Sequence, residues 1–170
     1  MDSLDAKALK FLMRSGRITW AELGRFLGLS APSAADRVRK LEETGVIRGY
    51  AALVDPASTG HPLTAFIFVS LASHRNRAAF LRAVEKLEQV AECHHITGDD
   101  DYLLKVRCRD TQDLDQLLAK ELKEKIGVAR TRTTIVLSTA KESVRVPIEE
   151  LRGETVKTNA GQDHSRRHWQ

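Results

Sequence analysis

The stretch from Arg17 to Tyr50, RITWAELGRFLGLSAPSAADRVRKLEETGVIRGY, decides how the first part of the chain folds. It holds two short apolar faces at helical spacing, formed first by Leu23, Phe26 and Leu27 and then by Ala34, Val38 and Leu41. Between these faces, Gly28 permits a sharp turn and Ser30 is a good N-cap for the helix that follows. The stretch therefore predicts a helix-turn-helix unit.

The composition limits the classes of protein to which this chain can belong. Its 170 residues suit one medium domain or two small ones, and a hydrophobic fraction of 42% is enough for a packed core. The formal net charge of +4 permits nucleic-acid binding without requiring it, because the placement of charges matters more than their sum. No apolar run approaches the roughly 18 residues of a membrane span, and the first residues lack a signal-peptide pattern. We therefore expect a cytoplasmic protein without a membrane partner.

Other local signals extend the helix-turn-helix in both directions. Residues 4–15 carry apolar side chains at near-helical spacing, and Thr19 with Glu22 forms a capping box that starts the next helix. The second helix of the turn is expected over residues 31–44. Residues 46–51 are expected to form a strand, so the unit is predicted to be a winged helix-turn-helix.

Residues 55–62 contain two prolines and a glycine, which mark a linker between two domains. The linker separates an N-terminal domain, residues 1–54, from a second domain, residues 63–140, and a partly flexible extension, residues 141–170, follows. Periodicity in the second domain predicts, in order, Leu63–Leu71 (strand), Asn76–Leu87 (helix), Val90–Thr97 and Tyr102–Arg109 (strands), Thr111–Lys123 (helix) and Val128–Thr139 (strand). This β-α-β-β-α-β order is typical of a ferredoxin-like α+β domain, a four-stranded antiparallel sheet with both helices on one face. The bare face is most simply covered by a second copy of the chain.

The helix over residues 31–44 is the candidate for contact with double-stranded DNA, because a helix fits the major groove. We expect its outward face to carry the base contacts, from Ser33, Asp36 and Arg37, with Arg37 able to bind guanine bidentately. Four other cations are better placed for phosphates: Arg25, Arg39, Lys40 and Arg48. The alternative is an ordinary solvated helix face.

The loop Gly98–Tyr102 is a second candidate site. Gly98 lets the backbone approach a small ligand, and the three carboxylates that follow it could hold an ammonium group. A hairpin turn that is rich in Asp because Asp suits turns explains the same residues equally well.

Metal and enzyme sites find little support. Neighbouring residues on a strand face opposite ways, so His94 and His95 are poor partners in one metal site, and no further ligand stands at zinc spacing. Cys93 and Cys108 fall on adjacent predicted strands, where they could lie near each other, and buried small hydrophobic residues fit them better than a redox pair. No nucleophile–base pair, phosphate-binding loop or dinucleotide motif is present, so we expect neither enzyme activity nor a cofactor.

From about residue 2 to residue 142 the sequence resembles the Lrp/AsnC transcription regulators, also called feast/famine regulatory proteins. In the first domain the resemblance is carried by Leu4-Asp5, Gly16-Arg17-Ile18, Glu22-Leu23, Gly28-Leu29-Ser30, Arg37-Val38, Leu41-Glu42, Gly45-Val46-Ile47 and Gly49-Tyr50. In the second it is carried by Gly98-Asp99-Asp100-Asp101-Tyr102-Leu103-Leu104, Gly127-Val128 and Thr131-Arg132-Thr133.

The resemblance implies a DNA-binding domain followed by a domain for ligand binding and oligomerisation. It implies homodimers that pair through their sheets and assemble further, often to octamers, with a small effector, frequently an amino acid, bound between dimers. Carried over to this chain, the effector residues are Gly98, Asp99, Asp101 and Tyr102, with Thr131 and Thr133 on the other wall of the site. Ala34 and Ala35 are smaller than the residues often found in relatives, so operator preference does not transfer. Siroheme decarboxylases share a similar fold, but these motifs do not resemble theirs.

Together these observations predict a sequence-specific DNA-binding transcription regulator that responds to a small effector, which the resemblance implies to be an amino acid. The alternative is an architectural DNA-binding protein without an effector.

Overall fold

A computed structural model describes residues 1–126 and 128–149. The chain divides into two compact units, Met1–Ala52 together with residues 143–149, and Leu53–Glu142. No helix within these described ranges is long and apolar enough to cross a membrane.

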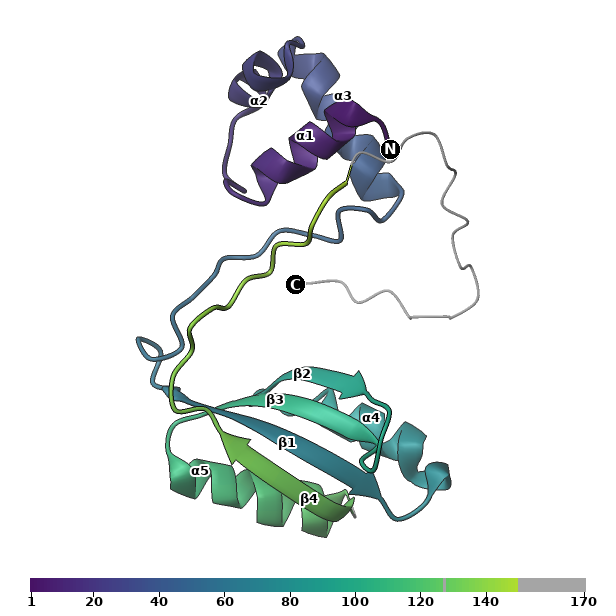
Figure 1. Cartoon of the computed structure of the whole chain (residues 1–170), viewed down its shortest axis with the longest axis vertical. Helices are drawn as coiled ribbons and strands as arrows, with labels where there is room; N and C mark the ends of the chain where they lie inside the picture. The colour runs from purple at the N-terminus through teal and green to yellow at the C-terminus, as the bar shows by residue number, and fades with distance from the viewer. Residues whose placement is uncertain (127, 150–170) are drawn as a thin grey trace. The chain divides into compact units, whose positions relative to one another are not determined.

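The N-terminal unit is a bundle of three helices (Figure 1), namely α1 (Ser3–Leu12), α2 (Trp20–Leu27) and α3 (Ala31–Glu43). Each helix begins at a residue whose side chain accepts a backbone N–H from the first turn: Asp2, Thr19 and Ser30. The core between the helices is made of the small and aliphatic side chains Ala8, Leu23, Leu27, Ala34 and Val38. The predicted helix-turn-helix is therefore confirmed.

The turn between α2 and α3 depends on two glycines. Gly28 ends α2 with a φ of 70°, in the left-handed region that glycine favours. The chain doubles back close to Gly24, so a Cβ at this position would stand 2.7 Å from the carbonyl oxygen of Leu29 and would not fit. The sequence identified the first glycine but gave no sign of the second.

The predicted strand over residues 46–51 is wrong. Residues 48–54 have no regular secondary structure, and the backbone N–H of Ile47 instead donates to the carbonyl of Leu41 at the end of α3. A strand needs a neighbour for its backbone groups, and no strand exists in the described part of this unit. The unit as described is therefore a helix-turn-helix without the predicted wing strand.

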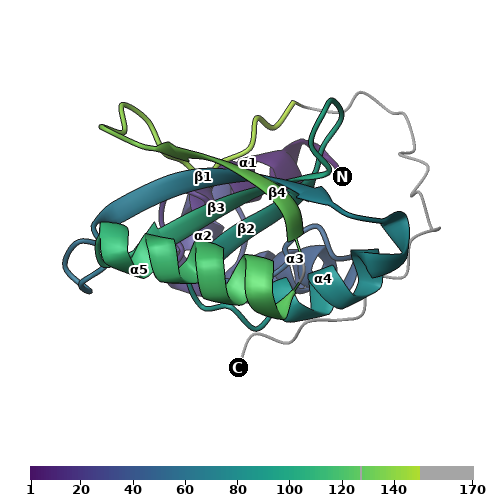
Figure 2. The same ribbon diagram turned by 90° about the horizontal axis from the view of Figure 1, so that it is seen from below.

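The second unit is built on one antiparallel sheet whose strands lie in the order β2-β3-β1-β4. The strands are β1 (Leu63–Leu71), β2 (Val90–His95), β3 (Tyr102–Cys108) and β4 (Val128–Ile135). Two helical segments lie on one face of this sheet (Figure 2): α4 (Arg77–Val84), which the short turn η1 (His74–Asn76) precedes, and α5 (Thr111–Gln116), which continues as the π-helical stretch η2 (Leu117–Lys125). The ferredoxin-like α+β prediction is confirmed.

Strict alternation along the two central strands separates a buried face from an outer face. On β3, Tyr102, Leu104, Val106 and Cys108 point toward the helices and are buried, whereas the residues between them are only half-buried. Phe80 of α4 completes this core. Burial raises the pKa of the Cys108 thiol to about 11, which keeps the thiol protonated at neutral pH.

Cys93 and Cys108 lie on adjacent strands but are not close to each other. Cys93 stands opposite Leu104 in the register of β2 with β3, and Leu104 is four residues before Cys108. Four residues of strand span about 13 Å, which is too far for a disulfide. Cys108 is fully buried in the core, as a small hydrophobic residue would be.

Candidate nucleic-acid interface and ligand loop

The exposed surface of α3 is polar and carries most of the predicted DNA contacts. Ser33, Asp36, Arg39 and Lys40 are all exposed, and Arg25 of α2 and Arg48 after α3 are exposed as well. Arg39 and Asp36 form an ion pair at 2.9 Å, and both side chains remain more than 60% exposed. An ion pair this exposed contributes little to stability, so Arg39 can exchange it for a phosphate at small cost.

Arg37 does not belong to this outward surface. Its Nη1 lies 2.6 Å from Oδ2 of Asp2 and 2.5 Å from Oδ1 of Asp5, both at the start of α1, and its side chain is only 25% exposed. The expectation that Arg37 faces outward is therefore corrected. The sequence held the signal, because Arg37 is three residues after Ala34 and four before Leu41, at the edge of the buried stripe.

The loop between β2 and β3 is held by its second aspartate, which the sequence did not single out. Gly98 adopts a φ of 114°, and Asp100 then turns inward, with only 9% of its surface exposed. Its carboxylate accepts hydrogen bonds from Ser70 Oγ at 2.9 Å, Arg130 at 3.2 Å and Arg132 at 3.3 Å. The hydroxyl of Ser70, followed by the two arginines, lowers the pKa of Asp100 from its ordinary value.

The two neighbouring aspartates have different surroundings. Asp101 fixes the loop to the end of β1, since its Oδ2 accepts the N–H of Leu71 at 2.7 Å and its own N–H donates to Val69 at 2.8 Å. The carboxylate of Asp99 is on the exposed side of the loop, and its backbone carbonyl accepts a bond from Arg130 at 3.3 Å. Of the two aspartates predicted to bind the ligand, Asp99 is thus the exposed one.

Tyr102 and the two threonines lie on the helix-covered side of the sheet. Val69 is the register partner of both Tyr102 and Thr131, so these residues form a row across three strands, and Thr133 begins the next row opposite Ile67. The structure thereby places Tyr102 and Thr131 on one face, about 10 Å apart across two strand spacings. Arg130 joins β4 to the loop from the other side of the sheet.

Tyr102 is part of the core rather than an exposed ligand contact. Only 2% of its surface is exposed, and its ring packs between Phe80, with centroids 4.8 Å apart, and His95, at 5.2 Å. Its hydroxyl is buried and has no hydrogen-bond partner among the described residues. A buried hydroxyl without a partner is costly, which is typical of a residue kept for more than packing.

Two hollows lie at opposite ends of the β2–β3 hairpin. A cavity of about 290 Å³ adjoins the loop and is lined by Phe68, Ile96, Thr97, Asp99, Asp100, Arg130 and Arg132. A larger hollow of about 920 Å³ lies near the start of β2, with cations such as Arg109 and carboxylates such as Asp113 among its lining residues. None of the predicted ligand residues lines the larger hollow.

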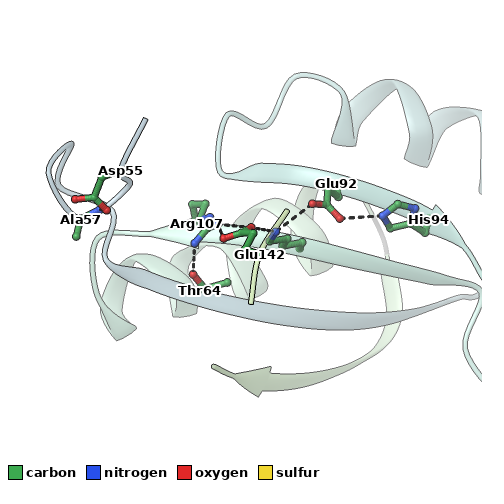
Figure 3. Close-up of polar contacts among 8 residues, drawn as sticks. Asp55, Ala57, Thr64, Glu92, His94, Arg107 and Glu142 are labelled. Carbon is green, nitrogen blue, oxygen red and sulfur yellow. Dashed lines mark hydrogen bonds and ion pairs between the residues drawn. The ribbon is translucent and has the colours of Figure 1, made fainter. Parts of the chain in front are cut away.

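Near the loop the outer face of the sheet combines an aromatic ring with an arginine, whereas its other end carries a network of ion pairs. The guanidinium of Arg132 stands 3.8 Å above the ring of Phe68, near the loop. At the far end Glu142, beyond β4, makes ion pairs with Lys105 and with Arg107 (Figure 3), the latter at 2.9 Å. These ion pairs hold the chain at Glu142 against β3.

The network around Glu142 continues along the sheet. Arg107 donates to Thr64 Oγ1 at 2.5 Å, and Lys105 reaches Glu92 of β2 at 3.1 Å (Figure 3). Glu92 in turn lies 3.1 Å from the His94 ring. Two cations of β3 are therefore balanced by carboxylates from β2 and from the chain beyond β4.

This network predicts a measurable dependence of stability on pH. The hydrogen bond from Lys105, then that from Arg107, lowers the pKa of Glu142 below its ordinary value of 4.5. A lowered folded-state pKa means that the stabilisation is present above pH 4.5 and is lost as the pH falls below it. We expect Glu142→Gln to lower the urea midpoint at pH 7 and to flatten its decline between pH 5 and pH 3. The exposed carboxylate variant Glu43→Gln serves as the control, and an equal flattening there would contradict the prediction.

The remaining candidates of the sequence carry no metal site. His94 and His95 point to opposite faces of β2, because they stand opposite Leu103 and Tyr102 of β3. Among the residues that the structure describes, no group of three or more His, Cys, Asp or Glu side chains is arranged to hold a metal ion.

Comparison with known proteins places this geometry in context. A model of the AsnC-type helix-turn-helix domain matches residues 1–42, and a model of the Lrp/AsnC ligand binding domain matches residues 64–146. The chain is 39% identical over 155 residues to the leucine-responsive regulatory protein of Escherichia coli (strain K12), a match that covers 88% of this chain and 92% of the relative.

Solved structures agree with both domains. A transcriptional regulator of Neisseria meningitidis in complex with L-Met superposes with a TM-score of 0.83 at 33% identity, covering 86% of this chain and 96% of that one. A feast or famine regulatory protein of M. tuberculosis complexed with L-methionine gives a TM-score of 0.80 at 32% identity, covering 85% and 97%. AsnC of E. coli gives 0.80 at 30% identity, covering 86% and 99%.

Proposed function

The chain belongs to the Lrp/AsnC family of transcription regulators, and from that premise we propose that it binds double-stranded DNA sequence-specifically in the cytoplasm and responds to an amino acid. The family consists of regulators with a helix-turn-helix domain rather than of enzymes. The single observation that supports the effector most directly is the loop at Gly98, with its open backbone and its link to β4.

In this proposal α3 enters the major groove. Ser33 and Asp36, near its N-terminus, are the base contacts, because the first residues of a recognition helix reach the base edges. Arg25, Arg39, Lys40 and Arg48 bind phosphates, since each is exposed on the N-terminal unit. Arg37, the third base contact expected from sequence, is better explained by its contacts with α1, which are treated below.

The effector is proposed to lie against the Gly98 loop and the adjoining edge of β4. The backbone at Gly98 can approach the ligand closely, and the exposed carboxylate of Asp99 suits an ammonium group. Thr131 and Thr133 supply hydroxyls on β4. Asp101 and Tyr102 have an indirect role, because Asp101 fixes the loop to β1 and Tyr102 packs in the core of the sheet. The complexes of relatives with L-methionine support an amino acid as the ligand class.

We also propose that two copies pair through the outer face of the sheet and that dimers assemble further, for example to an octamer. The half-buried Phe66, Phe68 and Leu103 on that face support a partner of the same kind, because a sheet face with aromatic side chains is rarely left bare. Ligand and DNA would then be coupled, since both favour particular arrangements of the dimers.

A direct test uses the full chain and two readouts. Selection from a random double-stranded DNA library should yield one enriched motif, and a thermal-shift screen of the twenty amino acids should raise the Tm with some of them. The double variant Thr131→Val and Thr133→Val should keep the motif and lose the thermal shift. Salt-dependent binding without an enriched motif, together with no shift from any amino acid, would favour the architectural alternative.

A further inference from the structure

We propose that Arg37 is a positioning residue that ties the recognition helix α3 to the start of α1, rather than a contact to DNA. The inference rests on the proposed DNA-binding function of α3. It is carried by the contacts of Arg37 with two aspartates that lie more than thirty residues earlier in the sequence.

The geometry leaves each aspartate with two separate tasks. Asp2 and Asp5 form the capping box of α1, in which Asp2 Oδ1 accepts the N–H of Asp5 and Asp5 Oδ2 accepts the N–H of Asp2, both at 2.8 Å. Their other oxygens, Asp2 Oδ2 and Asp5 Oδ1, both accept from Nη1 of Arg37, at 2.6 Å and 2.5 Å. All four carboxylate oxygens are thus used, and one guanidinium nitrogen closes the arrangement.

Burial makes this contact stronger than a surface ion pair. The side chains of Arg37 and Asp5 are only 25% and 16% exposed, so solvent screens them less than the exposed pair of Arg39 and Asp36. Without a cation between them, the two carboxylates of the capping box would repel each other at short range. The hydrogen bonds that Arg37 donates to Asp2 and Asp5 raise the pKa of its guanidinium, so it stays charged at any physiological pH.

The contact also supplies what the core between α1 and α3 does not. The buried side chains that α3 contributes to this core are small or aliphatic. They exclude water, but they do not fix the rotation of α3 about its axis. A charged bridge from α3 to the cap of α1 is directional and sets the rotation of α3 about its axis. Base contacts by Ser33 and Asp36 depend on that rotation, because a side chain must reach a base edge to within a hydrogen bond.

The deciding experiment neutralises the aspartates rather than the arginine. In the double variant Asp2→Asn and Asp5→Asn, Asn retains good N-capping ability, so the helix is kept while the charge on both partners of Arg37 is removed. If Arg37 acts as proposed, the affinity for the selected DNA motif falls about fivefold although the protein has become more positive. If Arg37 instead contacts DNA, the variant frees a cation, removes two like charges and binds more tightly, which would overturn the proposal.

Two further measurements separate this role from mere stability. Binding is measured at low temperature, where circular dichroism shows that each variant is folded, because a purely structural role would lower the Tm and leave this affinity unchanged. Arg37→Gln should reproduce the loss of affinity without changing the dependence of affinity on salt, and Arg37→Lys should restore part of the affinity.

Neutralising an exposed acid on α3, Glu43→Gln, is the control and should not weaken binding. A wild-type chain without any enriched motif would refute the proposed function itself, whereas tighter binding of the aspartate variant would refute only the role of Arg37.

Discussion

Phe80→Ala is expected to lower the free energy of unfolding of the second unit by about 3–5 kcal/mol, the usual cost of removing a buried phenyl ring. Phe80 is 1% exposed and is the one aromatic side chain that α4 contributes to the core. Its ring packs against Tyr102, so the cavity would open directly behind the loop that is proposed to bind the effector. Urea unfolding followed by far-UV circular dichroism measures the change, and we expect the amino-acid-induced rise in Tm to disappear with it.

Phe26→Ala is the matched control for this prediction. Phe26 also contacts another aromatic ring, that of Phe11, with centroids 4.4 Å apart, but 54% of its surface is exposed. Its truncation leaves no buried cavity and should lower the free energy of unfolding by no more than about 1 kcal/mol. If both variants lost similar stability, burial would not be the cause of the expected effect.

The sheet domain could be predicted closely because its sequence separates segments typical of strands from segments with the spacing of helices. The β-rich run over residues 63–71 predicted β1 with the bounds that the structure shows, Leu63–Leu71. The last strand was predicted to reach Thr139 but ends at Ile135, which pairs with Ala65. Val136 still donates its N–H to Thr64, but β1 begins at Leu63 and so has no residue to pair with Thr139. The end of a strand depends on where its partner strand ends, and the local sequence does not show which strands become partners.

The same reason explains the failure at residues 46–51. Val46, Ile47 and Tyr50 have high strand propensity, and the sequence alone contains no information on whether another strand lies alongside. Local propensity favours an extended conformation. Whether an extended segment becomes a strand depends on a partner elsewhere in the chain or in another copy.

In the candidate site the sequence located the loop but not the function of each aspartate. Asp99, Asp100 and Asp101 are chemically identical, and the direction in which each points is fixed only by the turn at Gly98 and by the arginines of β4. Asp100, the buried one, was therefore not among the predicted ligand residues, and Asp101, which was, accepts the backbone N–H of Leu71 at the end of β1. A charge pattern indicates where polar side chains gather but not the direction in which each of them points.

Removing Arg39 and Lys40 together is expected to reduce DNA binding more than any other pair of changes on the surface. Both side chains are exposed on α3, and neither belongs to the core. If each binds one phosphate, the double variant Arg39→Ala and Lys40→Ala lowers the slope of log affinity against log salt by about two for each bound protomer. The affinity at low salt should fall about a hundredfold, which titration of a labelled DNA duplex by fluorescence anisotropy measures.

The change in slope is decisive because a loss of net charge alone cannot produce it. Arg77→Ala and Arg82→Ala, on α4 of the second unit, remove the same two positive charges from exposed positions. Long-range attraction falls off within about 10 Å at 0.1 M salt, so this control should lower the affinity slightly and leave the slope unchanged. Equal slopes for the α3 variant and the wild type would show that α3 does not release counterions from the duplex. The DNA-binding surface would then have to be sought among the other cations of the N-terminal unit, beginning with Arg25 and Arg48.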